Sequence, residues 1–88
     1  MVVTEIRTSK KFEKQYKKLP AHLKTLAKQR EPFFRANPFD QRLETHKLHG
    51  KDRELWAFSI TGLYRIKFVF LEKGVALFLE IGTHDIYK

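Results

Sequence analysis

Histidine, arginine and tyrosine residues in the second half of this chain have the chemical types needed to move protons and hold a phosphate. His84 and Tyr87 lie in "IGTHDIYK" (81–88), directly after a strongly apolar run. An imidazole, whose ordinary pKa is about 6.5, serves as an acid or a base near neutrality. Arg65 offers a permanently charged fork for phosphate oxygens. A tyrosine ring can stack on an unpaired base.

Two further histidines, His46 and His49, stand three residues apart in "HKLHG" (46–50). A zinc site built on this pair would lack its usual third and fourth ligands, and the chain has no cysteine. We therefore expect no metal here. Either histidine can also be an idle surface residue. Basic residues crowd the same segment and suit phosphate contacts, although they can equally be solvated turn charges: Lys47, Lys51 and Arg53.

Cleaving RNA without a metal needs a base for the 2′-hydroxyl, an acid for the leaving oxygen and positive charge on the phosphate. Four residues supply these chemical types, and we predict that they form the catalytic group, with no cofactor: His84, Arg65, His46 and Tyr87. The predicted RNA-binding residues are Lys47, His49, Lys51, Arg53 and Lys67.

The elements that must position these side chains begin with a helical first half. A short β-prone run at 2–7 precedes Ser9, which can cap a helix whose apolar residues recur at helical spacing. Pro20 suits the first turn of a second amphipathic helix. Pro32 falls inside that helix, so we expect a kink or an early break near Glu31. The segment "NPFD" then forms a loop.

The apolar pattern changes to a period of two in the second half. Alternating runs at 53–60, 63–70 and 75–81 are joined by short glycine-containing turns and predict a three-stranded antiparallel meander. Two helices before it would cover its apolar face. We therefore predict one α+β domain over residues 1–88: an N-terminal strand, a helical hairpin and the meander, with both helices on one face of the sheet.

The alternation also predicts a register. With a tight turn at 72–73, Arg65 lies opposite Glu80 and Ile66 opposite Leu79, while Val75, Leu77, Leu79 and Ile81 share one face. The preceding turn puts Ser59 beside Arg65. Continuing the same parity, His84 emerges on the face that carries Arg65, away from the helices. Two alternatives stay open: Arg65 pairs with Glu80 as an exposed bridge, or Tyr87 is an anchor that folds back over the core.

The net charge of +8 is concentrated in residues 1–53, which hold fourteen basic and six acidic groups. Such a surface attracts a polyanion or an acidic protein, although charge can also serve solubility alone. The lysines of the first helix form either a solvated face or a contact for ribosomal RNA or an acidic partner. The absence of cysteine, of a signal-like segment and of a run of about 20 apolar residues favours the cytoplasm and no membrane partner.

Three segments give the chain a resemblance to a known family. "LHGKDRELWAFSI", "GLYRIKFVF" and the terminal "IGTHDIYK" resemble the RelE/ParE superfamily of toxins from toxin–antitoxin modules, over nearly the whole chain. "HKLHG" and "GTH" look most similar to the YafQ-like branch. In that resemblance His84 matches the acid/base histidine after the final strand, Arg65 the strand arginine and His46 the loop histidine. Tyr87 matches the terminal aromatic approximately.

The resemblance implies a cytoplasmic, metal-independent endoribonuclease that cuts mRNA on the ribosome and is silenced by a cognate antitoxin. The antitoxin would lay an acidic or apolar helix along the basic helices or in the sheet groove. Two other functions stay open on the same fold: a ParE-like toxin that inhibits gyrase without nuclease activity, and a non-toxic basic nucleic-acid-binding domain.

Overall fold

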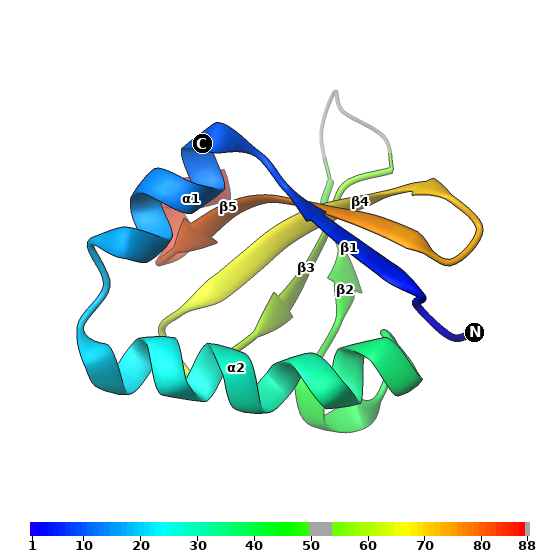
Figure 1. The fold of residues 1–88 in the computed structure, drawn as a ribbon, viewed down its shortest axis with the longest axis horizontal. Coiled ribbons are helices and arrows are strands. Elements are labelled where there is room, and N and C mark those ends of the chain that lie inside the picture. Colours follow the sequence, from blue (N-terminus) through cyan, green and yellow to red (C-terminus); the bar gives the residue numbers. More distant parts are fainter. Residues whose placement is uncertain (50–53, 88) are drawn as a thin grey trace.

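The computed structural model describes residues 1–49 and 54–87 and has the predicted α+β class. Five strands form one sheet in the order β1-β5-β4-β3-β2, and the consecutive strands β3, β4 and β5 form the predicted antiparallel meander (Figure 1). The elements are β1 (Glu5–Thr8), α1 (Lys10–Lys17), α2 (Ala21–Ala36), η1 (Gln41–Leu43), β2 (His46–Lys47), β3 (Trp56–Ser59), β4 (Arg65–Glu72), β5 (Val75–Gly82) and η2 (His84–Tyr87).

The two outer strands extend the meander on both sides. β1 begins later than the predicted run at 2–7 and pairs in parallel with β5. β2, which the sequence analysis did not predict, adds His46 and Lys47 to the opposite edge beside β3. His46 therefore belongs to the sheet, where the sequence pattern left it in an unconstrained loop. No helix in the described part of the chain is long and apolar enough to cross a membrane.

The helical half begins as predicted, because the Ser9 hydroxyl accepts a hydrogen bond from the backbone N–H of Phe12 and caps α1. Pro20 is the N-cap of α2, one position before its first turn. Of the kink or early break expected near Glu31, the break is wrong, since α2 continues through Pro32 to Ala36, and the kink stays a prediction. Proline removes one backbone donor, yet the helix continues and places Phe34, two residues later, in the core.

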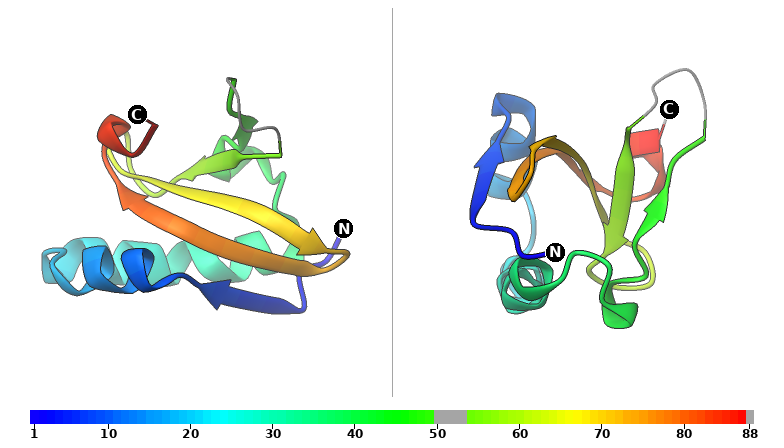
Figure 2. Two further views of the ribbon diagram at one scale, coloured as in Figure 1. Left: turned by 90° about the horizontal axis from the view of Figure 1, so that it is seen from above. Right: turned by 90° about the vertical axis from the view of Figure 1, so that its right-hand side faces the viewer.

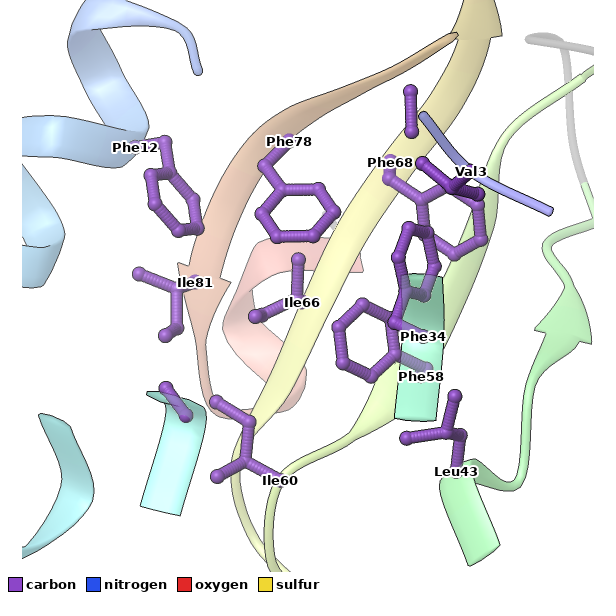
Figure 3. Packing of buried hydrophobic residues seen from close by; sticks show 12 residues of the cluster. Val3, Phe12, Phe34, Leu43, Phe58, Ile60, Ile66, Phe68, Phe78 and Ile81 are labelled. Carbon is purple, nitrogen blue, oxygen red and sulfur yellow. The ribbon is translucent and has the colours of Figure 1, made fainter. Parts of the chain in front are cut away.

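The core lies between the helices and one face of the sheet (Figure 3). Phe34 of α2 is fully buried, with ring centroids 4.8 Å from Phe58, 5.0 Å from Phe68 and 5.3 Å from Phe78. Phe34 stacks on Phe58 and meets Phe68 and Phe78 edge-on, and aromatic pairs at these separations gain favourable contact beyond the area that they bury. This aromatic cluster fixes α2 against β3, β4 and β5 and leaves the other face of the sheet uncovered by α1 and α2 (Figure 2).

The register of β4 and β5 differs from the prediction. Ile66 and Phe68 face the core as expected, but Arg65 pairs with Gly82, Ile66 with Ile81 and Lys67 with Glu80. A register shift between Lys67 and Phe68 breaks the alternation of β5, so that its core residues are Ala76, Phe78 and Ile81. The predicted pairing of Arg65 with Glu80, and the shared face of Val75, Leu77, Leu79 and Ile81, are therefore wrong. A bulge changes side-chain parity without any signal in the hydrophobic pattern.

Candidate active site

The turn η2 carries His84 and Tyr87 onto the open face of the sheet. Lys67 points to that face, because its neighbours Ile66 and Phe68 point to the core, and its Nζ donates a 3.0 Å hydrogen bond to the Ile86 carbonyl. Figure 2 shows the C-terminal turn on the side of the sheet opposite the helices. His84 thus emerges on the face that carries Arg65, although it reaches that face through a different register from the predicted one.

Ile86 is the buried anchor of this turn, with 5% of its surface exposed. It packs so closely on the end of β5 that a Cβ at Gly82 would lie 2.8 Å from Ile86 Cγ2. Any larger residue at position 82 would therefore force Ile86 to shift. Tyr87, which the sequence analysis also considered as an anchor over the core, is half-buried beside the histidines instead.

The Tyr87 ring contacts both candidate histidines. Its centroid lies 5.4 Å from His84 and 6.2 Å from His46, with both pairs close to edge-on. His46 and His84, 38 positions apart in the sequence, are both exposed and share this aromatic neighbour. The distance between the two imidazole centroids therefore cannot exceed the sum of these two separations. The two rings can lie on either side of one bound group.

Backbone geometry sets the tautomer of His46. Its Nδ1 lies 3.2 Å from the Glu44 carbonyl oxygen, which can only accept a hydrogen bond. In the neutral ring, Nδ1 therefore carries the proton and Nε2 carries the lone pair. Glu44 has left-handed backbone geometry, with φ at 52°, where the chain leaves η1 for β2. This turn aims the carbonyl of Glu44 at the imidazole.

Arg65 is held by neutral groups. Its Nη1 donates to Ser59 Oγ at 2.8 Å and to the Thr61 carbonyl at 2.9 Å. The predicted neighbour Ser59 is confirmed, since Ser59 and Arg65 pair across β3 and β4. Glu80 pairs with Lys67 and Lys11, so the alternative in which Arg65 bridges to Glu80 is wrong.

The hydroxyl of Tyr87 is buried and has no well-aligned hydrogen-bond partner in residues 1–49 and 54–87. Burial raises the pKa of Tyr87 above its ordinary value, while the charge of the Arg65 guanidinium and its approach to the phenol oxygen as a donor lower the pKa by a smaller amount. The phenol therefore stays protonated at neutral pH. A phenol whose proton is not donated to any described residue, beside a fixed guanidinium, is well placed to bind a phosphate oxygen.

The predicted RNA-binding residues differ in their surroundings, since one is held in an ion pair and others are exposed. Lys67 is engaged with Glu80 and the Ile86 carbonyl, at 2.6 and 3.0 Å. Lys47 is exposed and follows His46 in β2, so strand alternation directs it to the opposite face from His46. His49 is exposed after that strand. Lys51 and Arg53 lie outside the described residues. That these five residues contact RNA stays a prediction.

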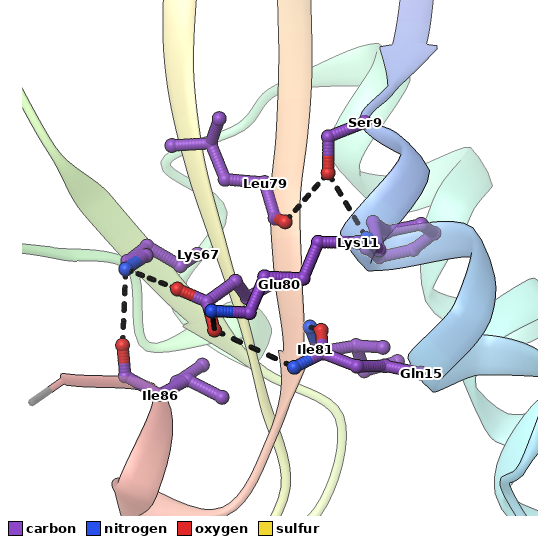
Figure 4. A network of polar contacts seen from close by, with 9 residues as sticks. Ser9, Lys11, Gln15, Lys67, Leu79, Glu80, Ile81 and Ile86 are labelled. Carbon is purple, nitrogen blue, oxygen red and sulfur yellow. Dashed lines mark hydrogen bonds and ion pairs between the residues drawn. The ribbon is translucent and has the colours of Figure 1, made fainter.

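The contacts that Glu80 and Gln15 make near the site were not predicted from the sequence. Glu80 joins Lys67 of β4 to Lys11 of α1, and Gln15 donates to the same carboxylate at 3.4 Å (Figure 4). One feature of the sequence could have indicated the role of Glu80, since it is a single acidic residue among the apolar residues of β5. The approach of α1 to that end of β5 has no local signature. No group of three or more histidine, cysteine or acidic residues in the described ranges is arranged to hold a metal ion.

Solved structures of toxins share this architecture. A RelE–RelB complex from Pyrococcus horikoshii has 19% identity and a TM-score of 0.74, covering 94% of this chain and 96% of its counterpart. The chain has the RelE/ParE toxin fold. The YoeB/ParE toxin of Agrobacterium tumefaciens has 14% identity and a TM-score of 0.78, with 92% and 99% covered, and YafQ of E. coli has 15% identity and a TM-score of 0.67, with 92% and 93% covered.

The RelE/ParE toxin fold confirms the architecture expected from the three resembling segments. Identities between 14% and 19% show the fold, and function on this fold depends on the residues placed at the site. No protein-family model matches the sequence, and a comparison with curated proteins found no match.

Proposed function

We propose that this chain is the toxin of a toxin–antitoxin module and acts as a metal-independent endoribonuclease on mRNA, in the cytoplasm and on the ribosome. The observation that carries the proposal is the gathering of His46, His84 and Tyr87 on the open face that also bears Arg65. A gyrase inhibitor on the same fold needs no such group of acid, base and phosphate ligand.

In the proposed reaction the 2′-oxygen attacks the adjacent phosphorus while the bond from phosphorus to the 5′-oxygen breaks. His46 Nε2, the unprotonated nitrogen of the neutral ring, accepts the proton of the 2′-hydroxyl. His84, in its protonated form, gives a proton to the departing 5′-oxygen. The products are a 2′,3′-cyclic phosphate and a 5′-hydroxyl, so every proton and bond is accounted for.

Negative charge builds up on the non-bridging phosphate oxygens as the 2′-oxygen attacks. Arg65 carries a permanent charge, and its hydrogen bonds to Ser59 and the Thr61 carbonyl fix it in place before the substrate arrives. The Tyr87 hydroxyl adds a second donor, because its proton is not donated to any of the described residues. Donors fixed in advance stabilise a transition state without the cost of reorganising water.

An antitoxin partner is supported by the structural relatives solved as toxin–antitoxin complexes, including RelB with RelE and DinJ with YafQ. In this chain a cavity of about 390 Å³ lies between β1, α1 and α2. Its lining includes the apolar residues Phe12 and Phe78 and charged residues of both signs, among them Lys17, Lys28, Glu13 and Glu31. The apolar lining suits the apolar side of an amphipathic helix, and the net charge of +8 on the chain favours acidic residues on the flanks of that helix.

Brief induction in a bacterial host tests the proposal. The wild-type chain should arrest growth and produce new 5′ ends within translated messages, detected by primer extension. His84→Ala and Arg65→Ala should remove both effects while a co-expressed antitoxin rescues the wild type. Growth arrest with intact messages and broken DNA would favour a gyrase-directed toxin, and no arrest at all would favour a basic binding domain.

A further inference from the structure

The C-terminal turn is connected to α1 through a chain of charged contacts. Lys67 Nζ lies 2.6 Å from Glu80 Oε2 and donates to the Ile86 carbonyl at 3.0 Å. The other oxygen of Glu80 lies 3.1 Å from Lys11 Nζ and accepts a hydrogen bond from Gln15. Figure 4 shows Glu80 between these two groups of contacts, with η2 on the side of Lys67.

Gln15 fixes this connection to the backbone of the sheet. While its amide nitrogen donates to Glu80, its amide oxygen accepts a 2.9 Å hydrogen bond from the backbone N–H of Ile81. Ser9, at the start of the same helix, donates to the Leu79 carbonyl at 2.7 Å. The carboxylate of Glu80 is thus held by a helix that is itself tied to β5 at two points.

The Lys67 and Glu80 side chains are each only 13% exposed. Removing two charges from water is costly, and an apolar pair of similar size would often be as stable or more so. What an ion pair adds is direction, because an ammonium group has several donors that can be aimed at once. Here Lys67 uses one donor on Glu80 and another on the Ile86 carbonyl, at the centre of η2.

We propose that the Lys67–Glu80 pair is a positioning device, which holds η2 in the orientation that sets Tyr87 and His84 for RNA cleavage. Its role for the reaction rests on the proposed ribonuclease function. Lys67 and Glu80 act through the backbone of Ile86, and neither is a catalytic residue. Ile86 and Gly82 supply the packing that holds the turn down, and the ion pair supplies its orientation. A displacement of about 1 Å at a site of this kind costs about 100-fold in rate.

Two variants weaken the device without removing its bulk. Lys67→Met keeps the apolar stem and removes the ammonium group, and Glu80→Gln keeps the shape and removes the charge. Lys67→Arg retains a charged donor for both Glu80 and the Ile86 carbonyl and serves as the conservative variant. Lys73→Met, in the exposed turn between β4 and β5, is the matched control for loss of one lysine charge.

Two readouts separate positioning from folding and from function. Nuclear Overhauser contacts from the Tyr87 ring to the His84 and His46 rings report the orientation of η2, and those between Phe34 and Phe58 report the core. Cleavage of a message in a purified translation system is measured at increasing concentrations of the protein. The curve gives the maximal cleavage rate and the protein concentration at which the rate is half-maximal. Lys67→Met and Glu80→Gln should lose the Tyr87 contacts, keep the core contacts and lower the maximal rate by 10- to 100-fold. The half-saturating concentration should change by less than about twofold.

Lys67→Arg should keep the Tyr87 contacts, and Lys73→Met should match the wild type in both the Tyr87 contacts and the cleavage rate. Tyr87 contacts that persist in both Lys67→Met and Glu80→Gln would overturn the proposal, as would their loss with an unchanged maximal rate. If the wild type cleaves no message, the ribonuclease function fails, and the Tyr87 contacts still decide whether the pair orients the turn.

Discussion

Replacing Tyr87 by phenylalanine separates what the site needs for stability from what it needs for chemistry. The change removes a single hydroxyl oxygen, which is buried and has no well-aligned partner in the described residues. A buried polar group left without a hydrogen bond costs about 1–3 kcal/mol. Because Tyr87→Phe removes that cost and keeps the ring against His84 and His46, we expect the free energy of unfolding to rise by about 1 kcal/mol.

For a domain of this size, about 1 kcal/mol raises the melting temperature by about 4–8 °C. The same variant should lose activity, because the proposed reaction uses the hydroxyl as a donor to the phosphate. Loss of one such donor costs about 10²- to 10³-fold in rate. The assays are thermal unfolding followed by circular dichroism, and the maximal cleavage rate in a purified translation system.

Tyr16→Phe is the matched control, since the Tyr16 hydroxyl donates to the Lys24 carbonyl at 3.4 Å and lies on the helical side of the molecule. Tyr16→Phe should lower the melting temperature slightly or leave it unchanged, and its cleavage rate should equal that of the wild type. A lower melting temperature for Tyr87→Phe would show that its hydroxyl is satisfied. An unchanged cleavage rate would show that it does not contact the reacting phosphate. Either result refutes the corresponding half of the reasoning.

Three further predictions concern the supports of the site. Gly82→Ala should destabilise the chain by about 1–3 kcal/mol and lower cleavage, because its Cβ would displace Ile86; unchanged unfolding and cleavage would contradict the close contact. Burial raises the pKa of Glu80, but hydrogen bonds from Lys67, Lys11 and Gln15 outweigh it and hold the pKa below its ordinary value. The stability advantage over Glu80→Gln should therefore be full at neutral pH and shrink as the pH falls below about 4, in melting curves recorded across pH; an advantage that grows in acid would reverse the sign. Phe34→Ala should cost about 3–5 kcal/mol in denaturant unfolding, and a cost below about 1 kcal/mol would contradict its central place in the core.

Local patterns predicted the elements that depend on local chemistry. Ser9 caps α1 because a hydroxyl before a helix satisfies a free backbone N–H, and this needs no tertiary information. Ile66 and Phe68 face the core because strand alternation is set by backbone geometry. The same alternation places Arg65 on the open face, whereas His84 is carried there by the turn η2 and through a register that the alternation did not predict.

The features that were wrong or missed depend on contacts between distant segments. The bulge beside Phe68 shifts β5 without a sequence signal, and α2 continues through Pro32 and carries Phe34 into a core formed with distant strands. The two-residue strand β2 is a strand because its backbone pairs with β3, a contact between segments that the local sequence does not indicate. Glu80 was considered as a partner of Arg65, and only the three-dimensional approach of α1 and Lys67 reveals its actual contacts.

The chemical nature of the cut ends tests the central claim most directly. A message cleaved by the wild-type chain in a purified translation system can be recovered and its new termini identified by mass spectrometry. Attack by the 2′-hydroxyl predicts a 2′,3′-cyclic phosphate on the upstream fragment and a 5′-hydroxyl on the downstream one, with neither fragment formed by His84→Ala. A 3′-hydroxyl paired with a 5′-phosphate, or the same cut made by His84→Ala, would contradict it.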